Sequence, residues 1–198
     1  MFENLKSDLL RDCYISYQKP SPINKLLVII KSMGFQAIAI YRFGRWSDKV
    51  FASRRVVIPR YFFLAIYRCL YYTITKMYGI DINPKAIIGK GFYIGHFAGI
   101  EIGACKIGEY CSIHQHVKIG YERGNKQGKI PHIGDYVWIG PHAQISANVN
   151  IGNRATVSAG SLVVDNVPPN NLVAGNPARV ISNLYDNGPL LHKLSLRR

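Results

Sequence analysis

The residues of this chain that could carry acid–base chemistry include six histidines and eleven carboxylates. Among them, His96 follows Asp81 by fifteen residues. An imidazole can take a proton from a hydroxyl group, and a carboxylate beside it can hold its tautomer and stabilise the imidazolium that forms. The pair would therefore support attack by an activated hydroxyl, provided that the fold brings the two side chains together.

Two further histidines, His114 and His116, are separated by one residue and would face the same side of a straight segment. Such spacing is compatible with a metal site, but no third ligand is indicated and carboxylates are sparse nearby, so we expect no metal. A substrate contact for His116 and an ordinary surface or interface role for both histidines stay open. The remaining histidines are interpreted as surface residues: His132, His142 and His192.

The elements that must position these residues are indicated by a six-residue repeat. Such a period fits neither a helix nor a simple alternating strand; it places one aliphatic residue on each short straight segment, with a turn before the next. Three such segments would make one triangular coil. We therefore predict a mainly β fold, a left-handed parallel β-helix of about five coils, from the aliphatic positions Ile133, Ile139, Ile145, Ile151, Val157 and Val163.

The repeat begins at Ile82 and is interrupted once in the middle of the chain. Fourteen residues separate Ile119 from Ile133, so segment 121–132 is expected to leave the coil as an extruded loop. In a coil of three six-residue segments, positions fifteen apart lie in adjacent turns close to one edge. The spacing therefore predicts that Asp81 can reach the imidazole of His96.

The chain is expected to divide into three parts. Residues 1–79 form a helical N-terminal region, 80–181 form the β-helix, and 182–198 form a C-terminal tail. Helices are expected over 24–41 and 60–78. The N-terminus shows no secretory signal, which predicts a cytoplasmic protein, with the inner face of the membrane as an alternative location.

The formal net charge of +14, with 25 basic and 11 acidic residues, calls for an anionic partner. No nucleic-acid module is visible, so we expect a phosphorylated ligand or a membrane surface. Segment 54–78 mixes aromatic and basic residues and is a candidate for peripheral membrane association. The alternative is that its aromatics pack on the base of the β-helix or on neighbouring subunits.

The four cysteines form no CxxC pair and are interpreted as reduced packing residues.

Three motifs carry more specific information: Asp81-Ile82-Asn83-Pro84, the His-x-x-Gly-Ile block from His96 to Ile100, and the block from Gly175 to Arg179. In these stretches the chain resembles the hexapeptide-repeat acyltransferases. The first two point to the serine O-acetyltransferase-like branch, with its relatives in exopolysaccharide and capsule O-acetylation. The resemblance implies that His96 is the general base, that Asp81 orients it, and that no metal takes part.

The same resemblance implies acetyl-CoA as the co-substrate, bound along a groove between two coils, and a homotrimer whose clefts are each assembled from two chains. Acetyl-CoA would also account for part of the basic charge. Trp138 is a candidate wall of the groove, although a packing role in the trimer is an equal alternative. The candidate residues of this groove are Trp138, Gly140, Ala143, Ala159, Gly160, Pro177 and Arg179.

At two places the chain departs from the serine enzymes. Gly95 stands where the family has an aspartate that helps to hold the amino acid, and Lys129 and Ile130 stand where it has an Arg-His pair. A charged acceptor would lose contacts, whereas a sugar hydroxyl needs neither. Gly95, His116 and Lys129 are the candidate acceptor contacts.

We therefore expect an acetyl-CoA-dependent O-acetyltransferase acting on a carbohydrate hydroxyl in cell-surface polysaccharide synthesis. Two alternatives remain open. One is a serine O-acetyltransferase of cysteine biosynthesis. The other is a non-catalytic hexapeptide-repeat scaffold or membrane-surface binding protein, because a β-helix by itself does not determine an activity.

Overall fold

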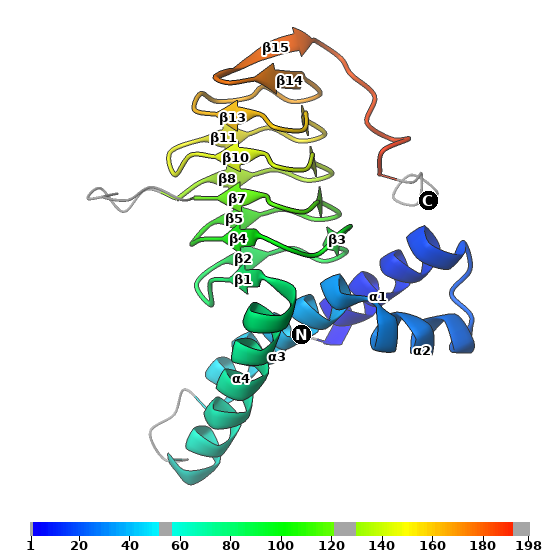
Figure 1. Cartoon of the computed structure of the whole chain (residues 1–198), viewed down its shortest axis with the longest axis vertical. Coiled ribbons are helices and arrows are strands. Elements are labelled where there is room, and N and C mark those ends of the chain that lie inside the picture. The colour runs from blue at the N-terminus through cyan, green and yellow to red at the C-terminus, as the bar shows by residue number, and fades with distance from the viewer. Residues whose placement is uncertain (1, 52–56, 121–129, 192–198) are drawn as a thin grey trace.

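The computed structural model describes residues 2–51, 57–120 and 130–191, and places a helical region at the base of a triangular prism (Figure 1). The helices are α1 (Phe2–Tyr17), α2 (Pro22–Lys31), α3 (Met33–Val50) and α4 (Val57–Tyr78). Within the described residues, no single helix is long and apolar enough to cross a membrane. The pair α2 and α3 passes by length and composition, but it is bent by 84° at its junction.

One bend between helices was not predicted. The sequence suggested a continuous helix over 24–41, but the structure divides it at Ser32. The Ser32 N–H donates to the carbonyl of Val28 at 2.9 Å and closes α2, while its hydroxyl accepts from the N–H of Phe35 at 3.2 Å and begins α3. Serine is favoured at such an N-cap because its short side chain satisfies a free N–H of the first turn.

The prism is built from very short strands: β1 (Ile80–Ile82), β2 (Ile87–Ile88), β3 (Tyr93–Ile94), β4 (Ile100–Ile102), β5 (Lys106–Ile107), β6 (Ser112–Ile113), β7 (Lys118–Ile119), β8 (His132–Ile133), β9 (Trp138–Ile139), β10 (Gln144–Ile145), β11 (Asn150–Ile151), β12 (Thr156–Val157), β13 (Leu162–Val163), β14 (Leu172–Gly175) and β15 (Ala178–Ser182). They form three sheets, ordered β1-β4-β7-β10-β13, β2-β5-β8-β11 and β3-β6-β9-β12-β14-β15. All pairs are parallel except β14 with β15.

Four turns contribute a strand to each sheet, and in a fifth turn a single bridge from Val167 to Ile151 takes the place of the middle strand. The aliphatic residues of the repeat point inward, and Ile113, Ile119 and Val157 are fully buried. The predicted left-handed β-helix is therefore confirmed. One side chain of each segment fills the narrow interior, which is why the period is six.

The turns differ in length. Ile80 pairs with Ile100, so the first turn is longer than three six-residue segments, whereas Ile102 pairs with Ile119, so the next turn is slightly shorter than three segments. The uniform coil assumed from the repeat holds only later, for example between Gln144 and its β13 partner Leu162. Because of these differences, residues of the first turn do not lie below the residues that an even eighteen-residue turn would predict; Asp81, for example, pairs with Glu101.

Buried arginines attach the helical region to the prism. Arg11 in α1 donates to the carbonyl of Cys111 at 2.9 Å. Arg42 in α3 donates to the carbonyl of Ile88 at 2.8 Å and pairs with Asp8 at 2.8 Å. A buried charge is costly unless it is paired and hydrogen-bonded. Arg42 meets both conditions, and the Arg11 guanidinium donates hydrogen bonds to backbone carbonyls and to the hydroxyl of Ser112. The helices are thus held in one position against the first two turns.

Candidate active site

His96 lies in the turn between β3 and β4, at the edge of the prism where it meets the helices. Its side chain is exposed and lines a cleft of about 280 Å³. The helical region contributes Asp12, Tyr17 and Lys31 to the lining of this cleft, and Phe97, which follows His96, lines it as well. A base at this place can meet a small polar molecule that enters from solvent.

Two of the cleft residues were missed by the sequence analysis. Asp12 in α1 is 4% exposed, and its carboxylate oxygens accept hydrogen bonds from Ser16 at 2.9 Å and Ser32 at 2.7 Å. Burial raises the pKa of the Asp12 carboxyl, against the effect of these two hydrogen bonds. Lys31, at the end of α2, is exposed. The cleft therefore holds one carboxyl group and one cation beside the imidazole.

Asp81 is not joined to His96 by a hydrogen bond within the described residues. It lies on β1 opposite Glu101 and accepts a hydrogen bond from the hydroxyl of Tyr71 in α4. Burial, followed by this contact with Asp81, raises the pKa of the Tyr71 hydroxyl. Asp81 also lines a separate cleft, with Asn83. The first turn is longer than expected, and the Asp81 carboxylate is bonded to Tyr71 instead of to the imidazole of His96. The role of Asp81 in orienting His96 therefore stays a prediction.

Gly95, immediately before His96, is packed against the imidazole of His114 one turn above. A Cβ atom at Gly95 would lie 2.7 Å from Cδ2 of that ring. The His114 Nδ1 atom is 3.1 Å from the carbonyl oxygen of Ile139, and the ring centroid is 4.9 Å from that of Trp138. The glycine therefore gives His114 the space that a larger side chain at position 95 would occupy.

His116 and His142 stack on each other, with ring centroids 4.6 Å apart and an interplanar angle of 19°. Both have left-handed backbone, with φ of 58° and 61°. His142 is exposed, in agreement with its predicted surface position, but its contact with His116 was not predicted. His116 comes three residues after Ile113, and His142 comes three residues after Ile139. An alignment of the repeats would therefore have placed the two histidines at equivalent corners. No group of three or more possible metal ligands occurs in the described parts of the chain.

Most of the predicted residues share one edge of the prism, at the corners that follow the strands of the third sheet. In chain order these corners hold His96, His116, then Gly140, then Ala159 with Gly160, and finally Pro177 at the turn between β14 and β15. Ala159 and Gly160 are exposed, and a Cβ atom at Gly160 would meet nothing within 4 Å. The edge is therefore open to solvent in its fourth turn.

The remaining predicted residues are placed differently. Ala143 is fully buried. Its carbonyl accepts a hydrogen bond from the N–H of Lys118, and its N–H donates to the carbonyl of Gly140. It can therefore contribute only to the wall behind the edge. Arg179 on β15 is exposed and pairs with Asp165 at 3.1 Å. Lys129 lies outside the described residues, as does most of the predicted loop 121–132.

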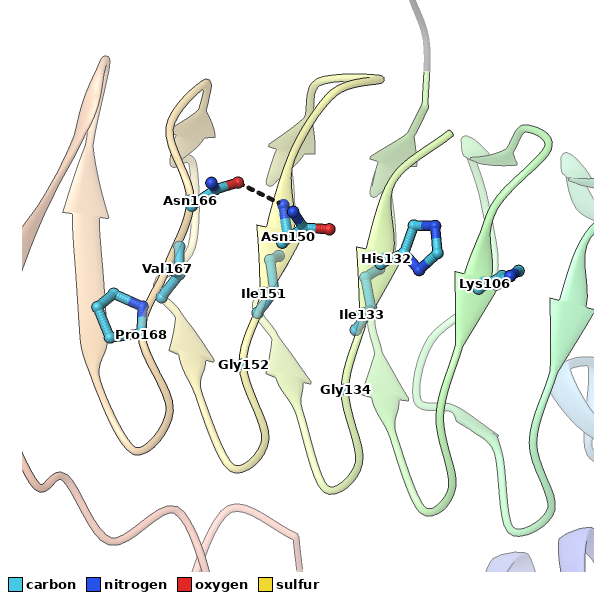
Figure 2. A pocket seen from close by; sticks show the side chains of 10 residues that line it. All are labelled: Lys106, His132, Ile133, Gly134, Asn150, Ile151, Gly152, Asn166, Val167 and Pro168. Carbon is cyan, nitrogen blue, oxygen red and sulfur yellow. Dashed lines mark hydrogen bonds between the residues drawn. The ribbon is translucent and has the colours of Figure 1, made fainter. Parts of the chain in front are cut away.

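A larger hollow of about 430 Å³ lies on the second sheet (Figure 2). Polar side chains line its outer surface in a ladder, from Lys106 and His132 to Asn150 and Asn166. The side-chain oxygen of Asn166 accepts from the N–H of Asn150 at 2.8 Å. None of the predicted site residues lines this hollow. The size of a hollow thus does not identify the site. Most of the residues predicted for catalysis and acetyl-CoA binding lie instead along the edge that carries His96.

Comparison with known proteins gives consistent matches. Residues 130–165 match the family "Bacterial transferase hexapeptide (six repeats)". The serine acetyltransferase of Synechococcus elongatus is 34% identical over 183 residues, which cover 91% of this chain and 69% of that protein. The chain spans 33% to 54% of the plant and Salmonella typhimurium serine acetyltransferases that it also matches.

Two solved structures are similar over nearly the whole chain. Soybean serine acetyltransferase complexed with serine superposes with a TM-score of 0.70 and 32% identity, covering 90% of this chain and 70% of that one. Serine acetyltransferase from Brucella abortus in complex with coenzyme A gives a TM-score of 0.71 and 26% identity, covering 92% and 68%. The likeness thus includes the helical region as well as the prism.

Proposed function

The chain belongs to the serine acetyltransferase family, and from this premise we propose that it transfers the acetyl group of acetyl-CoA to the hydroxyl of L-serine. The observation that carries the proposal is the cleft beside His96. It offers a base for a hydroxyl, a carboxyl group from Asp12 and a cation from Lys31. Those three groups complement the hydroxyl, ammonium and carboxylate of an amino acid.

The carbohydrate acceptor favoured by the sequence analysis is a wrong prediction, and so is the assignment to polysaccharide synthesis. The relatives and structural neighbours reported above are serine acetyltransferases, and one of them is complexed with serine. The prediction depended on the missing family charges at Gly95 and Ile130. It did not consider that charges from the helical region could reach the same cleft.

In the proposed reaction, neutral His96 accepts the proton of the serine hydroxyl while that oxygen attacks the thioester carbonyl of acetyl-CoA. Collapse of the tetrahedral intermediate breaks the carbon–sulfur bond, and the imidazolium returns its proton to the leaving thiolate. The products are O-acetylserine and free CoA. Asp81 would stabilise the imidazolium after its carboxylate turns away from Tyr71.

We place acetyl-CoA along the edge that rises from His96 to Pro177. Adjacent turns are about 4.8 Å apart, so four steps cover roughly 19 Å, a suitable length for an extended pantetheine arm. The open surface at Ala159 and Gly160 leaves room for it, and Trp138 with Gly140 lies beside its path. Arg179, exposed at the upper end, would meet the phosphates of the nucleotide.

A homotrimer is part of the proposal. The His96 side chain and the upper corners of the edge are exposed in the single chain, so a neighbouring prism could close the other side of the cleft. Burying flat prism faces would also remove apolar surface such as Ile87, which is 48% exposed. Analytical ultracentrifugation is expected to give three times the chain mass of 22.3 kDa. An active monomer would contradict this assembly.

The activity is tested by following free thiol release from acetyl-CoA with L-serine, D-serine, L-threonine and ethanolamine as acceptors. We expect turnover with L-serine, less with L-threonine, and little with ethanolamine, which lacks the carboxylate. Mass spectrometry of the product should show the acetyl group on the serine oxygen. A folded protein that binds acetyl-CoA but shows no transfer to L-serine would overturn the proposal.

A further inference from the structure

Helix α4 exposes apolar and basic side chains together along its outer surface. Phe62 is 63% exposed and Met77 68%. The helix contains no aspartate or glutamate, and its basic residues Arg60, Arg68 and Lys76 are exposed. An exposed surface of this kind is unusual for a helix that only packs against its own chain, and it indicates a partner.

The exposed residues of α4 form two neighbouring stripes. Phe62, Leu70 and Met77 recur at spacings of eight and seven residues and make an apolar stripe. Tyr61, Arg68, Tyr72 and Lys76 make a second stripe beside it, at spacings of seven, four and four. The Lys76 ammonium lies 5.7 Å from the Tyr72 ring centroid. We call the two stripes together the outer face of α4.

The opposite face of α4 is occupied by α3. Tyr67 is buried against Gly44, where an added Cβ atom would lie 2.4 Å from the Tyr67 ring. Trp46 contacts Phe63 edge-on, with ring centroids 5.9 Å apart. The packed pair of helices extends away from the base of the prism, at the end opposite β15 (Figure 1). The outer face is therefore held on a supported hairpin that projects from the body of the protein.

We propose that the outer face of α4 docks on an anionic lipid bilayer surface. Arg68 and Lys76 would contact lipid phosphates, and the tyrosines would lie at headgroup level. Phe62, Leu70 and Met77 would enter the boundary of the acyl chains. The helix would lie in the plane of the interface, so that the rest of the molecule stays in water.

Charge favours this occupant over a second copy of the chain. A two-fold contact between two such faces would set the basic residues of one α4 against the basic helix of the partner, and α4 has no carboxylate to pair with them. The surrounding described surface of the hairpin adds Arg45 and Lys49 against one acid, Asp48. A nucleic acid would match the charge but would leave the apolar stripe exposed.

The test is co-sedimentation of the full chain with phosphatidylcholine vesicles, with and without roughly one-third phosphatidylglycerol. We expect binding to the anionic vesicles only, weakened by added salt. The variant Arg68→Glu/Lys76→Glu should lower the partition coefficient at least about tenfold. Lys6→Glu/Lys19→Glu is the matched control, because it makes the same change in net charge at exposed residues outside α4, and it should bind nearly as well as the parent.

Phe62→Ser/Met77→Ser should also release the protein from anionic vesicles, while Ile23→Ser/Leu26→Ser, on the exposed side of α2, should not. Equal binding to neutral and anionic vesicles, or equal losses in the α4 and control variants, would overturn the proposal. So would an oligomer of higher order, seen by light scattering without lipid, that Phe62→Ser/Met77→Ser abolishes. Thiol release measured without vesicles reports on the transferase reaction separately.

Discussion

The imidazole of His114 occupies the space beside Gly95 in which the serine acetyltransferase resemblance leads one to expect an aspartate. An added Cβ atom at Gly95 would be 2.7 Å from Cδ2 and 2.9 Å from Nε2 of that ring. The two positions are therefore linked: any side chain at position 95 would require the imidazole of His114 to move. The absence of an aspartate at position 95 does not by itself exclude an amino-acid acceptor, because Asp12 and Lys31 line the same cleft.

Introducing the aspartate without making room for it should destabilise the fold. In Gly95→Asp the new side chain must displace His114 from Trp138 and from the carbonyl of Ile139, and overpacking of this kind costs about 1–3 kcal/mol. Urea unfolding measures the loss. In a protein that already carries His114→Ala, adding Gly95→Asp should cost much less unfolding free energy than it does in the wild type. An equal loss of unfolding free energy in the two proteins would show that positions 95 and 114 are independent.

Removing the imidazole of His96 should abolish acetyl transfer without affecting the fold. The side chain is exposed, so His96→Ala leaves no buried cavity, while loss of a general base lowers kcat by about 10²–10⁴. The assay is thiol release with L-serine, together with a thermal unfolding curve. His132→Ala, on the second sheet, is the matched histidine control and should keep its activity. Wild-type-like turnover by a folded His96→Ala protein would remove this residue from the mechanism.

The charges of the cleft should act on the binding of serine. Lys31→Gln removes the cation proposed to meet the acceptor carboxylate, and Asp12→Asn removes the acid proposed to meet the ammonium. A lost charge-assisted hydrogen bond is worth about 1.5–3 kcal/mol, so KM for L-serine should rise about tenfold or more. Steady-state kinetics at saturating acetyl-CoA measures it.

The KM for acetyl-CoA should change little in either cleft variant, because neither residue lies on the edge that we assign to the donor. A purely structural role for Asp12, whose carboxylate also bonds Ser16 and Ser32, predicts a different outcome. It would lower the unfolding free energy and leave both KM values of the folded protein unchanged.

The contact between Tyr71 and Asp81 allows the orienting role of Asp81 to be separated from a structural one. If Asp81 turns toward His96 during catalysis, Asp81→Asn should lower kcat by about 10–10² fold, whereas Tyr71→Phe should change it little. If Asp81 only anchors α4 to β1, both variants should lose similar stability and neither should lower kcat per folded molecule. Kinetics and unfolding on both variants distinguish these outcomes.

Stability should fall as the solution becomes alkaline. Burial raises the pKa of Cys105 and of Cys111 to about 12, well above that of an unfolded thiol. The folded state therefore keeps these protons while the unfolded chain releases them. The stabilisation is complete below the unfolded pKa and is lost as pH rises from there through about 12, by up to ~1.4 kcal/mol per pH unit for each thiol.

Urea unfolding under reducing conditions at about pH 8 and about pH 10.5 tests this prediction. The slope with pH should be smaller in Cys105→Ala than in the parent, even though the cavity lowers the stability of that variant at both pH values. An unchanged slope would mean that the Cys105 thiol does not contribute to the linkage.

Much of the fold could be predicted from local pattern because the interior of the prism is one side chain deep. Every sixth residue must be aliphatic to fill it, so Ile113 and Ile139 indicate the architecture without any information on distant contacts. The same period locates the corners of the prism. The family resemblance assigned Gly140 and Gly160 to one groove, and the structure places both on the edge that carries His96, at the corners after β9, β12 and β3.

The sequence by itself thus determined the β-helix and the edge that carries His96, because both depend on a short-range period. Only the tertiary structure decided the surroundings of that edge. The first turn is longer than the repeat predicts, which sets Asp81 opposite Glu101, and α4 supplies the tyrosine that holds it. The cleft beside His96 is completed by Asp12 and Lys31, whose positions depend on how the helices pack against the prism. Such long-range packing leaves no periodic trace in the sequence.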